Sequence, residues 1–300
     1  MSNYISIIVL LAMISFLGCK DLVNENFEAV DPVQVVNSFL IQDSAVKIHV
    51  SMIRGLDDKE IELISNANVF LIVDGEWTEK LSYHFDGYYK GLTIVEAGRK
   101  YSCVVELNGF KEIFCEDSIP FPYELTGIEH INNAAINYEG IKIPAIEFTF
   151  KNEPNEVRYG QFVIHLLTNQ GTEYESWRKG FIQETVDPVL LSEGLNIQVF
   201  SNENITGNEY TMHVNYNTGS SSCGDDSCWV ELYPVVFELR SISENYYNYL
   251  RQLKLYEKGR FPDFGGLSYG VFPLHSNVSN GYGIFAGYST VYTDTIFPNQ

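Results

Sequence analysis

Residues 67–73 read Ala-Asn-Val-Phe-Leu-Ile-Val, and Asp74-Gly75 follows them directly. β-branched and aromatic residues suit a pleated, half-buried strand, and an Asp-Gly pair is a strong signal for a tight turn between antiparallel strands. The stretch therefore predicts a β-strand that ends in a hairpin turn. If this strand belongs to a sheet, similar short strands separated by turns should lie on both sides of it.

The neighbouring segments have this pattern. Residues 46–53 alternate apolar and polar side chains with the period of two that is typical of a strand with one buried face. Residues 80–85 and 88–92 flank the turn Asp86-Gly87, and Asn108-Gly109 predicts a further hairpin. Short strands at a spacing of about ten residues are typical of sandwiches. We therefore predict an immunoglobulin-like or transthyretin-like β-sandwich over residues 33–121.

Residues 122–300 are expected to form a second β-rich, sandwich-like domain, with Pro120 and Pro122 at the boundary. Further strands are predicted at 145–150, 159–167, 195–200, 209–216, 229–240 (with a bulge or an edge position at Pro234) and 283–292. One prominent α-helix is expected near 242–258, with Ser241 as its N-cap and Glu244 completing a capping box. The predicted fold is therefore mainly β, and it ends in a stretch rich in glycine and aromatic residues.

The N-terminus has a different character. Residues 5–18 carry no charge and are almost wholly apolar, but they are shorter than the roughly 20 residues that span a bilayer. Such a run is typical of a signal peptide, and Gly18-Cys19 directly after it resembles a bacterial lipobox. We predict a removable signal at 1–18, lipidation of Cys19, and a lipidated tether at 19–32. A plain signal peptide with an incidental cysteine and a buried N-terminal strand are the alternatives.

The charge restricts the possible partners. The formal net charge is −20, and 45% of the residues are hydrophobic, which is ample for packed cores. Binding to nucleic acid needs clustered Lys and Arg, so nucleic acid is a poor partner, and an anionic membrane surface is disfavoured for the same reason. Cations, neutral ligands and a protein partner remain open, as does the simpler interpretation that the charge serves solubility.

Four cysteines follow Cys19, and an even number in an exported chain suggests disulfides. A three-residue loop at 108–110 would place Cys103 opposite Cys115 in one ladder. Cys223 and Cys228 would close a small loop, for which a structural disulfide is favoured over a redox or zinc pair.

The order of several segments resembles the DUF4249 lipoproteins of Bacteroidetes. The segments that carry this resemblance are Val35–Leu40, Ala67–Leu71, Gly87–Tyr89, Ala97–Tyr101, Ile119-Pro120, Ser243–Leu250 and Val278–Tyr288. The resemblance implies a lipid-anchored outer-membrane protein with a TonB-dependent receptor as its partner, and it supplies no catalytic residue and no cofactor. Lys20-Asp21 is similar to the surface-export signal of such lipoproteins, which implies a cell-surface location. Ser44, Ser118 and Thr295 lie in tripeptides that resemble the O-glycosylation motif of this phylum.

No catalytic motif or metal-binding motif stands out. A set of aromatic residues near the C-terminus forms either a ligand or partner surface or, as we favour, core packing: Tyr246, Tyr269, Phe272, Tyr282, Phe285 and Tyr288. The leading functional hypothesis is a non-enzymatic accessory of a TonB-dependent transport system. A surface glycan-binding or peptide-binding protein is the alternative, and a hydrolase with an unrecognised site is a third.

Overall fold

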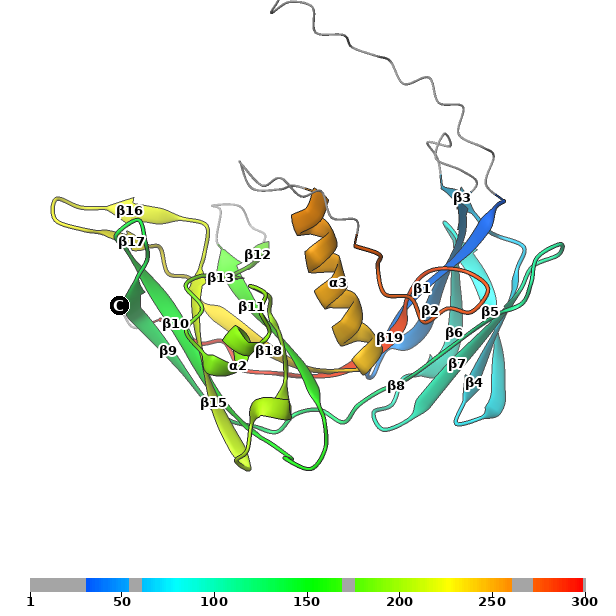
Figure 1. The fold of residues 1–300 in the computed structure, drawn as a ribbon, viewed down its shortest axis with the longest axis horizontal. Coiled ribbons are helices and arrows are strands. Elements are labelled where there is room, and N and C mark those ends of the chain that lie inside the picture. The colour runs from blue at the N-terminus through cyan, green and yellow to red at the C-terminus, as the bar shows by residue number, and fades with distance from the viewer. Residues whose placement is uncertain (1–30, 54–60, 169–175, 261–271, 299–300) are drawn as a thin grey trace, which may run out of the picture.

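The computed structural model describes residues 31–53, 61–168, 176–260 and 272–298. Within these ranges the chain is mainly β, and its long helix lies where the sequence predicts one. Two β-rich lobes lie side by side in Figure 1, with helix α3 between them. Among the described helices, none combines the length and the apolar character that crossing a membrane would require.

Two groups of elements form the lobes. The N-terminal lobe contains β1 (Val33–Ile41), β2 (Ala45–Ile53), β3 (Glu62–Leu63), β4 (Asn68–Val73), β5 (Glu76–Phe85), β6 (Tyr88–Ile94), β7 (Lys100–Glu106) and β8 (Ile113–Ser118). The C-terminal lobe contains β9 (Leu125–Ile136), β10 (Ile141–Lys151), β11 (Tyr159–Thr168), β12 (Ser176–Lys179), β13 (Phe181–Ile182), α2 (Pro188–Ser192), β14 (Val199–Ser201), η1 (Asn202–Asn204), β15 (Glu209–Asn217), β16 (Ser221–Cys223), β17 (Cys228–Val230) and β18 (Val235–Ile242). The helix α3 (Glu244–Arg260) and the strand β19 (Phe285–Tyr292) contact both lobes.

The core of the N-terminal lobe contains side chains from strands β1, β2 and β4 to β8. Strand β5 pairs with β6 on one edge and with β4 on the other, so the sheet folds over at β5 and encloses apolar side chains. Alternate residues of β2 supply part of this core: Val46, Ile48, Val50 and Met52 are all buried. The period-two alternation of residues 46–53 therefore produces the buried face that the sequence predicts.

The C-terminal segment completes the N-terminal lobe. Ser279 N–H donates to Phe114 O of β8 over 2.9 Å, and Tyr282 N–H donates to Gln34 O of β1 over 3.0 Å. Strand β19 then pairs in parallel with β1, and the side chain of Phe285 lies in the N-terminal core. The N-terminal lobe is therefore not built from the N-terminal part of the chain alone.

A glycine makes this close approach possible. Gly283 has φ +123°, and a Cβ atom at this position would overlap with the carbonyl oxygen of Val36 on β1. A residue with a side chain would be strained by the backbone conformation and would also push the two segments apart.

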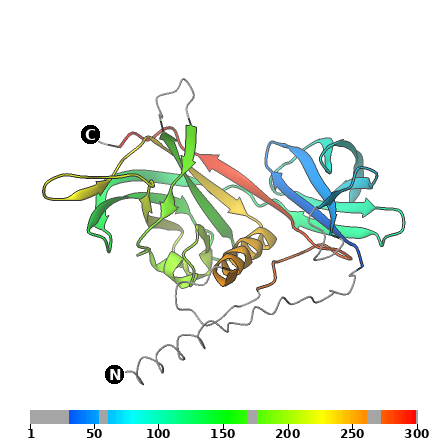
Figure 2. The ribbon, with the colours of Figure 1, turned by 90° about the horizontal axis from the view of Figure 1, so that it is seen from above.

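The core of the C-terminal lobe lies between two sheets. Strands β11, β18 and β19 continue the large sheet beyond β1, and a smaller sheet that includes β9, β10 and β15 packs against them. Phe148 of β10 meets Phe237 of β18 with ring centroids 4.5 Å apart. Figure 2 shows β19, drawn in red, running from one lobe into the other.

Helix α3 covers the joint between the lobes. The ring centroid of Tyr246 lies 5.0 Å from that of Phe39 on β1, which belongs to the N-terminal lobe. The next residue, Tyr247, stacks on Tyr159 of β11 in the C-terminal lobe, with ring centroids 4.4 Å apart. The helix therefore packs its tyrosines against both lobes.

The predicted N-cap of this helix is wrong. The cap is Ser243, whose Oγ accepts a hydrogen bond from Tyr246 N–H over 3.2 Å. Ser241 is a buried residue of β18, and its Oγ accepts from Arg158 Nη2 over 3.0 Å. Its main chain is paired with a neighbouring strand on both sides, so the sheet continues past it and the helix begins later.

Two predicted strands differ in extent. The predicted strand 229–240 is divided between β17 and β18, because Pro234 has no N–H to donate to a ladder. Of the predicted strand 195–200, only the end joins the short β14, and Ile197 packs beside the tyrosines of α3 instead.

One of the two predicted disulfides is present. Cys223 and Cys228 are bonded, as predicted, and join β16 to β17. Cys103 and Cys115 lie opposite each other as the hairpin predicts, but both are free, buried thiols, so the predicted bond between them is wrong. The neighbouring Cys103 and burial together raise the pKa of the Cys115 thiol well above its ordinary value.

The position of the pair in the ladder explains the missing bond. Phe114 points both of its main-chain polar groups away from β7, because Ser279 donates to its oxygen and accepts from its N–H. Its neighbour Cys115 therefore occupies a hydrogen-bonded position opposite Cys103. Such positions have Cα atoms about 5.5 Å apart, against about 4.5 Å at the alternate positions. The narrow Cβ separation of a disulfide, about 3.8 Å, suits the closer positions better.

Candidate functional site between the lobes

A cavity of about 530 Å³ lies where the two lobes meet the start of α3. Its walls come from the end of β8 and the linker after it, from the loop before β11, and from the turn between β18 and α3. The lining residues are Gly98, Asp117, Ser118, Ile119, Pro120, Phe121, Glu153, Glu156, Val157, Arg158, Tyr159, Ile242, Ser243, Glu244 and Asn245. Ligand sites occur preferentially at junctions of this kind, so this cavity is the candidate site.

Asp117 is the buried acid of the cavity. Its carboxylate accepts hydrogen bonds from Ser118 N–H (2.9 Å), from Asn245 Nδ2 (3.3 Å) and from Gly287 N–H (3.2 Å). Burial raises the pKa of this carboxyl from 3.8 to about 6, and hydrogen bonds from Ser243 and the other donors offset part of the effect. A single carboxylate on β8 therefore ties together α3 and β19.

Arg158 is the cation of the cavity, and it is held in place. Its guanidinium carbon lies 4.3 Å from the ring centroid of Tyr123. The same group donates to the oxygen of Phe121 in the linker and to Ser241 Oγ in β18. These contacts fix the linker against the C-terminal lobe and leave one fixed positive charge in the wall.

Acidic residues outnumber Arg158 around the cavity. Glu153, Glu156 and Glu244 line it and are exposed to solvent, and no ion pair engages them within the described ranges. With the buried Asp117, the cavity offers a polar surface of mixed charge with an excess of acids. Such a lining suits recognition of a polar or cationic group by charge and hydrogen bonds.

One hydroxyl group of the cavity, that of Ser243, has a structural role. Ser243 Oγ caps the helix, and His275 Nε2 lies 3.0 Å from Asn245 Oδ1 rather than near a serine. Burial lowers the pKa of His275, which favours its neutral form. Among the described residues, the cavity therefore holds no serine aligned with a histidine base.

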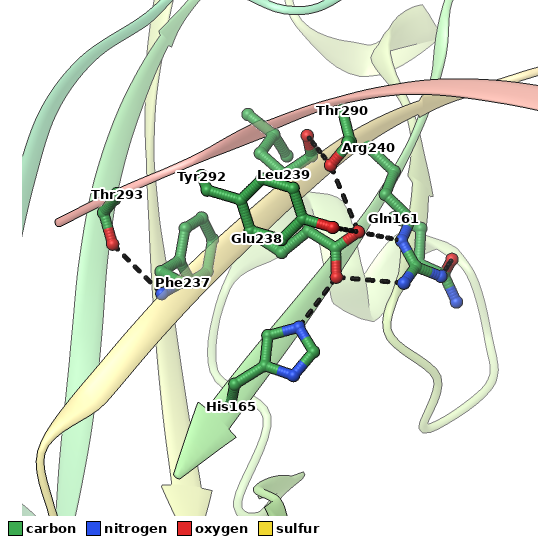
Figure 3. Close-up of polar contacts among 9 residues, drawn as sticks. All are labelled: Gln161, His165, Phe237, Glu238, Leu239, Arg240, Thr290, Tyr292 and Thr293. Carbon is green, nitrogen blue, oxygen red and sulfur yellow. Dashed lines mark hydrogen bonds and ion pairs between the residues drawn. The ribbon is translucent and has the colours of Figure 1, made fainter. Parts of the chain in front are cut away.

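A second polar cluster lies on the large sheet (Figure 3), and none of its residues lines the cavity. The buried carboxylate of Glu238 interacts with His165 Nε2 (2.7 Å), and it accepts from Arg240 Nε (2.6 Å) and Nη2 (2.9 Å), from Thr290 Oγ1 (3.1 Å) and from Tyr292 OH (3.1 Å). Although burial alone raises its pKa, the bonds from Arg240 and His165 hold the pKa of Glu238 below its ordinary value.

This cluster is satisfied by its own members. Arg240 also donates to Gln161 Oε1 over 3.0 Å and lies over the ring of Tyr288, 4.7 Å from its centroid. The network joins β11, β18 and β19, and a buried ion pair with this many hydrogen bonds fixes the register of the three strands. No set of three or more candidate metal ligands comes together in the described ranges, here or elsewhere.

The structure divides the aromatic set between the core, as the favoured interpretation predicts, and the surface. Tyr246, Phe285 and Tyr288 are buried, because they fill the space between helix and sheet and the N-terminal core. Tyr282 and Phe272 are exposed. The sixth residue of the set, Tyr269, lies outside the described residues. These positions therefore do not form one continuous platform.

The three predicted glycosylation sites are accessible. Ser44, Ser118 and Thr295 are all exposed, and Ser118 lines the cavity beside Asp117. Cys19, the predicted lipidation site, lies outside the described residues.

Comparison with known proteins identifies one family. A family model described as "Domain of unknown function (DUF4249)" matches residues 21–293. No curated protein matches the chain. The family match covers both lobes and all of the cavity.

Proposed function

The chain belongs to the DUF4249 family, and from that premise we propose that it is a lipid-anchored, non-enzymatic accessory of a TonB-dependent transport system in the outer membrane of Bacteroidetes. The observation that carries this proposal is Cys19. It follows an uncharged apolar run at residues 5–18, and the family match begins two residues after it, at residue 21. The match leaves residues 1–20 outside the family domain, which supports the proposal that a leader is cut before Cys19.

The cavity between the lobes supports a binding role for such an accessory. It is formed by parts of the chain far apart in sequence, and its fixed groups, Asp117 and Arg158, are held by hydrogen bonds before any ligand arrives. Preorganised polar groups lower the entropic cost of association. We assign to this cavity the contact with the transporter.

Metabolic labelling with palmitate tests the anchor. The wild-type chain should incorporate palmitate, whereas Cys19→Ala should not and should keep residues 1–18, so that it migrates as a larger species. Labelling that persists in Cys19→Ala would refute lipidation at this residue. The variant Cys103→Ala is the matched control, because it removes a buried thiol and should leave the labelling unchanged.

Capture from native outer membranes tests the partner. The wild-type chain should recover a TonB-dependent receptor, and Glu156→Lys, at the cavity, should reduce this recovery at least tenfold. Glu139→Lys changes the same charge at an exposed turn away from the cavity and should recover the receptor normally. Equal recovery by both variants would remove the cavity from the contact, and recovery of no barrel protein by the wild type would refute the transport role.

A further inference from the structure

One end of the N-terminal lobe exposes a group of large apolar side chains. In the strand pairing, Val33 of β1 lies opposite Ile53 of β2, and Leu63 of β3 lies opposite Ser51 on the other edge of β2. Ile53, Ile61 and Leu63 are 50%, 65% and 46% exposed. Three aliphatic side chains at this level of exposure on neighbouring strands form a patch rather than scattered surface residues.

The patch continues into a group of aromatic and basic residues on the same face. The ring of Tyr88 on β6 contacts His49 of β2, with ring centroids 4.7 Å apart, and Phe85 of β5, with centroids 6.1 Å apart. Lys47 Nζ lies 3.8 Å from the centroid of the Tyr88 ring. Phe85 is 48% exposed. Aromatic rings beside lysines are typical of surfaces that lie at a membrane–water interface.

The two lysines of this face are placed against each other. Lys47 and Lys90 occupy directly opposite positions of β2 and β6, and both are exposed. Like charges directly opposite each other in a sheet are destabilising. Asp86, in the turn between β5 and β6, forms no ion pair among the described residues. In a chain of net charge −20, this is a local basic site that anionic groups would stabilise.

The face also lies next to the point where the chain enters the lobe. Val33, at its edge, is the first residue of β1. Val33 lies fourteen positions after Cys19, and a chain of this length spans at most about 50 Å when fully extended. A lipid on Cys19 would therefore hold this end of the lobe within about 50 Å of the bilayer.

We propose that this face, defined by Val33, Ile53, Ile61, Leu63, Phe85, Tyr88, Lys47 and Lys90, lies against the lipid bilayer surface. The aliphatic group enters the headgroup region, and Lys47 and Lys90 contact lipid phosphates, so that the anchored protein has a fixed orientation. The inference rests on the proposed lipidation of Cys19. It goes beyond the proposed lipidation, because a lipid at the end of a tether of this length would not by itself fix the orientation of the lobe.

Fluorescence quenching in vesicles tests the orientation. Full-length lipidated protein carrying Leu63→Cys with an environment-sensitive dye is reconstituted into vesicles of phosphatidylethanolamine and phosphatidylglycerol that contain spin-labelled lipid. The dye should be quenched at least threefold more than the same dye at Ile136→Cys, an exposed position of β9 in the other lobe. Equal quenching at both positions would overturn the proposal.

Charge reversal tests the basic half of the face. Each lysine beside an anionic surface contributes about a fivefold change in affinity, so Lys47→Glu combined with Lys90→Glu should reduce quenching at Leu63 at least twofold. Lys179→Glu, an exposed lysine of the C-terminal lobe, should leave it unchanged. Palmitate incorporation is measured on the same samples. Protein that lacks palmitate refutes the anchor itself, whereas labelled protein without quenching at Leu63 refutes only the orientation.

Discussion

Asp117 shows how one buried side chain can make a joint between lobes sensitive to pH. Its carboxyl has a raised pKa of about 6 in the folded protein because it is buried, against an ordinary value of 3.8. A carboxyl of this kind takes up a proton on folding between these two values. Its contribution to stability is therefore fully present below about pH 4 and is lost as the pH rises through about 6.

The substitution Asp117→Asn should remove this dependence. The shift of about two pH units corresponds to about 3 kcal/mol, so the unfolding free energy of the wild type should fall by about that amount, relative to the variant, between pH 4 and pH 7.5. Urea denaturation at a series of pH values measures the difference. Ser118→Ala, at the neighbouring exposed residue, should give a curve parallel to that of the wild type. A parallel curve for Asp117→Asn would show that the carboxyl does not titrate in this range.

Part of the site could be predicted at this scale. Ile113, Cys115 and Asp117 alternate along β8, so extending the period-two pattern past the cysteine places Asp117 on the buried face. Arg158 and Glu238 carry no such signal, because most of their partners come from segments that the sequence does not place side by side; only Arg240 lies on the same strand as Glu238. The sequence predicts correctly that Cys103 lies opposite Cys115. It does not show whether this is a hydrogen-bonded or a non-hydrogen-bonded position of the ladder, and that difference explains why the thiols are free.

At the scale of elements, the contact between the C-terminal segment and β1 depends on Gly283. A Cβ atom there would meet the main chain of Val36 rather than a movable side chain. Gly140 provides a matched control, since it also has a positive φ, +80°, but has nothing within 4 Å of the Cβ position.

Alanine at these two glycines should have different effects. Gly140→Ala should cost about 1 kcal/mol, from backbone strain alone. Gly283→Ala should cost at least about 3 kcal/mol, because β1 and the C-terminal segment must also separate. Thermal unfolding of the two variants compares the costs, and similar losses for both would contradict a close contact at residue 283.

Elements with clean periodicity were predictable, and those defined by tertiary pairing were not. The alternation of 46–53 and 209–216 identifies β2 and β15 almost to the residue. Strand β9 has no such alternation, because both of its faces are partly buried at the edge of the smaller sheet. The N-cap of α3 is Ser243 and not the predicted Ser241, because Ser241 is still paired within the sheet.

At the scale of the whole molecule, the N-terminal lobe depends on residues near the C-terminus. A fragment of residues 31–121 lacks Val278 and Phe285 in its core and lacks the partner of both edge strands. We expect this fragment to show no cooperative unfolding transition by circular dichroism. Joining residues 276–292 to its end through a Gly-Ser linker should restore one. A cooperative transition in the fragment alone would show that the lobe is self-sufficient.

Sequence periodicity indicates the two β-rich regions and predicts a boundary near Pro120. Val278 and Phe285, which follow that position, nevertheless lie in the core of the N-terminal lobe. The pairing of the last strand, β19, with the first strand, β1, could not be predicted from periodicity. Parallel pairing of β1 with β19 joins positions 247 residues apart, Ser38 and Phe285, and no local pattern encodes such a contact.

That pairing also sets an order of events during synthesis. The first strand is made early, but its parallel neighbour emerges last, so the N-terminal core cannot be finished while the chain is still growing. Contacts between such distant positions form slowly, because a long loop must close before they contribute. Until the C-terminal segment has been made, the edge strands β1 and β8 of that core lack their partners.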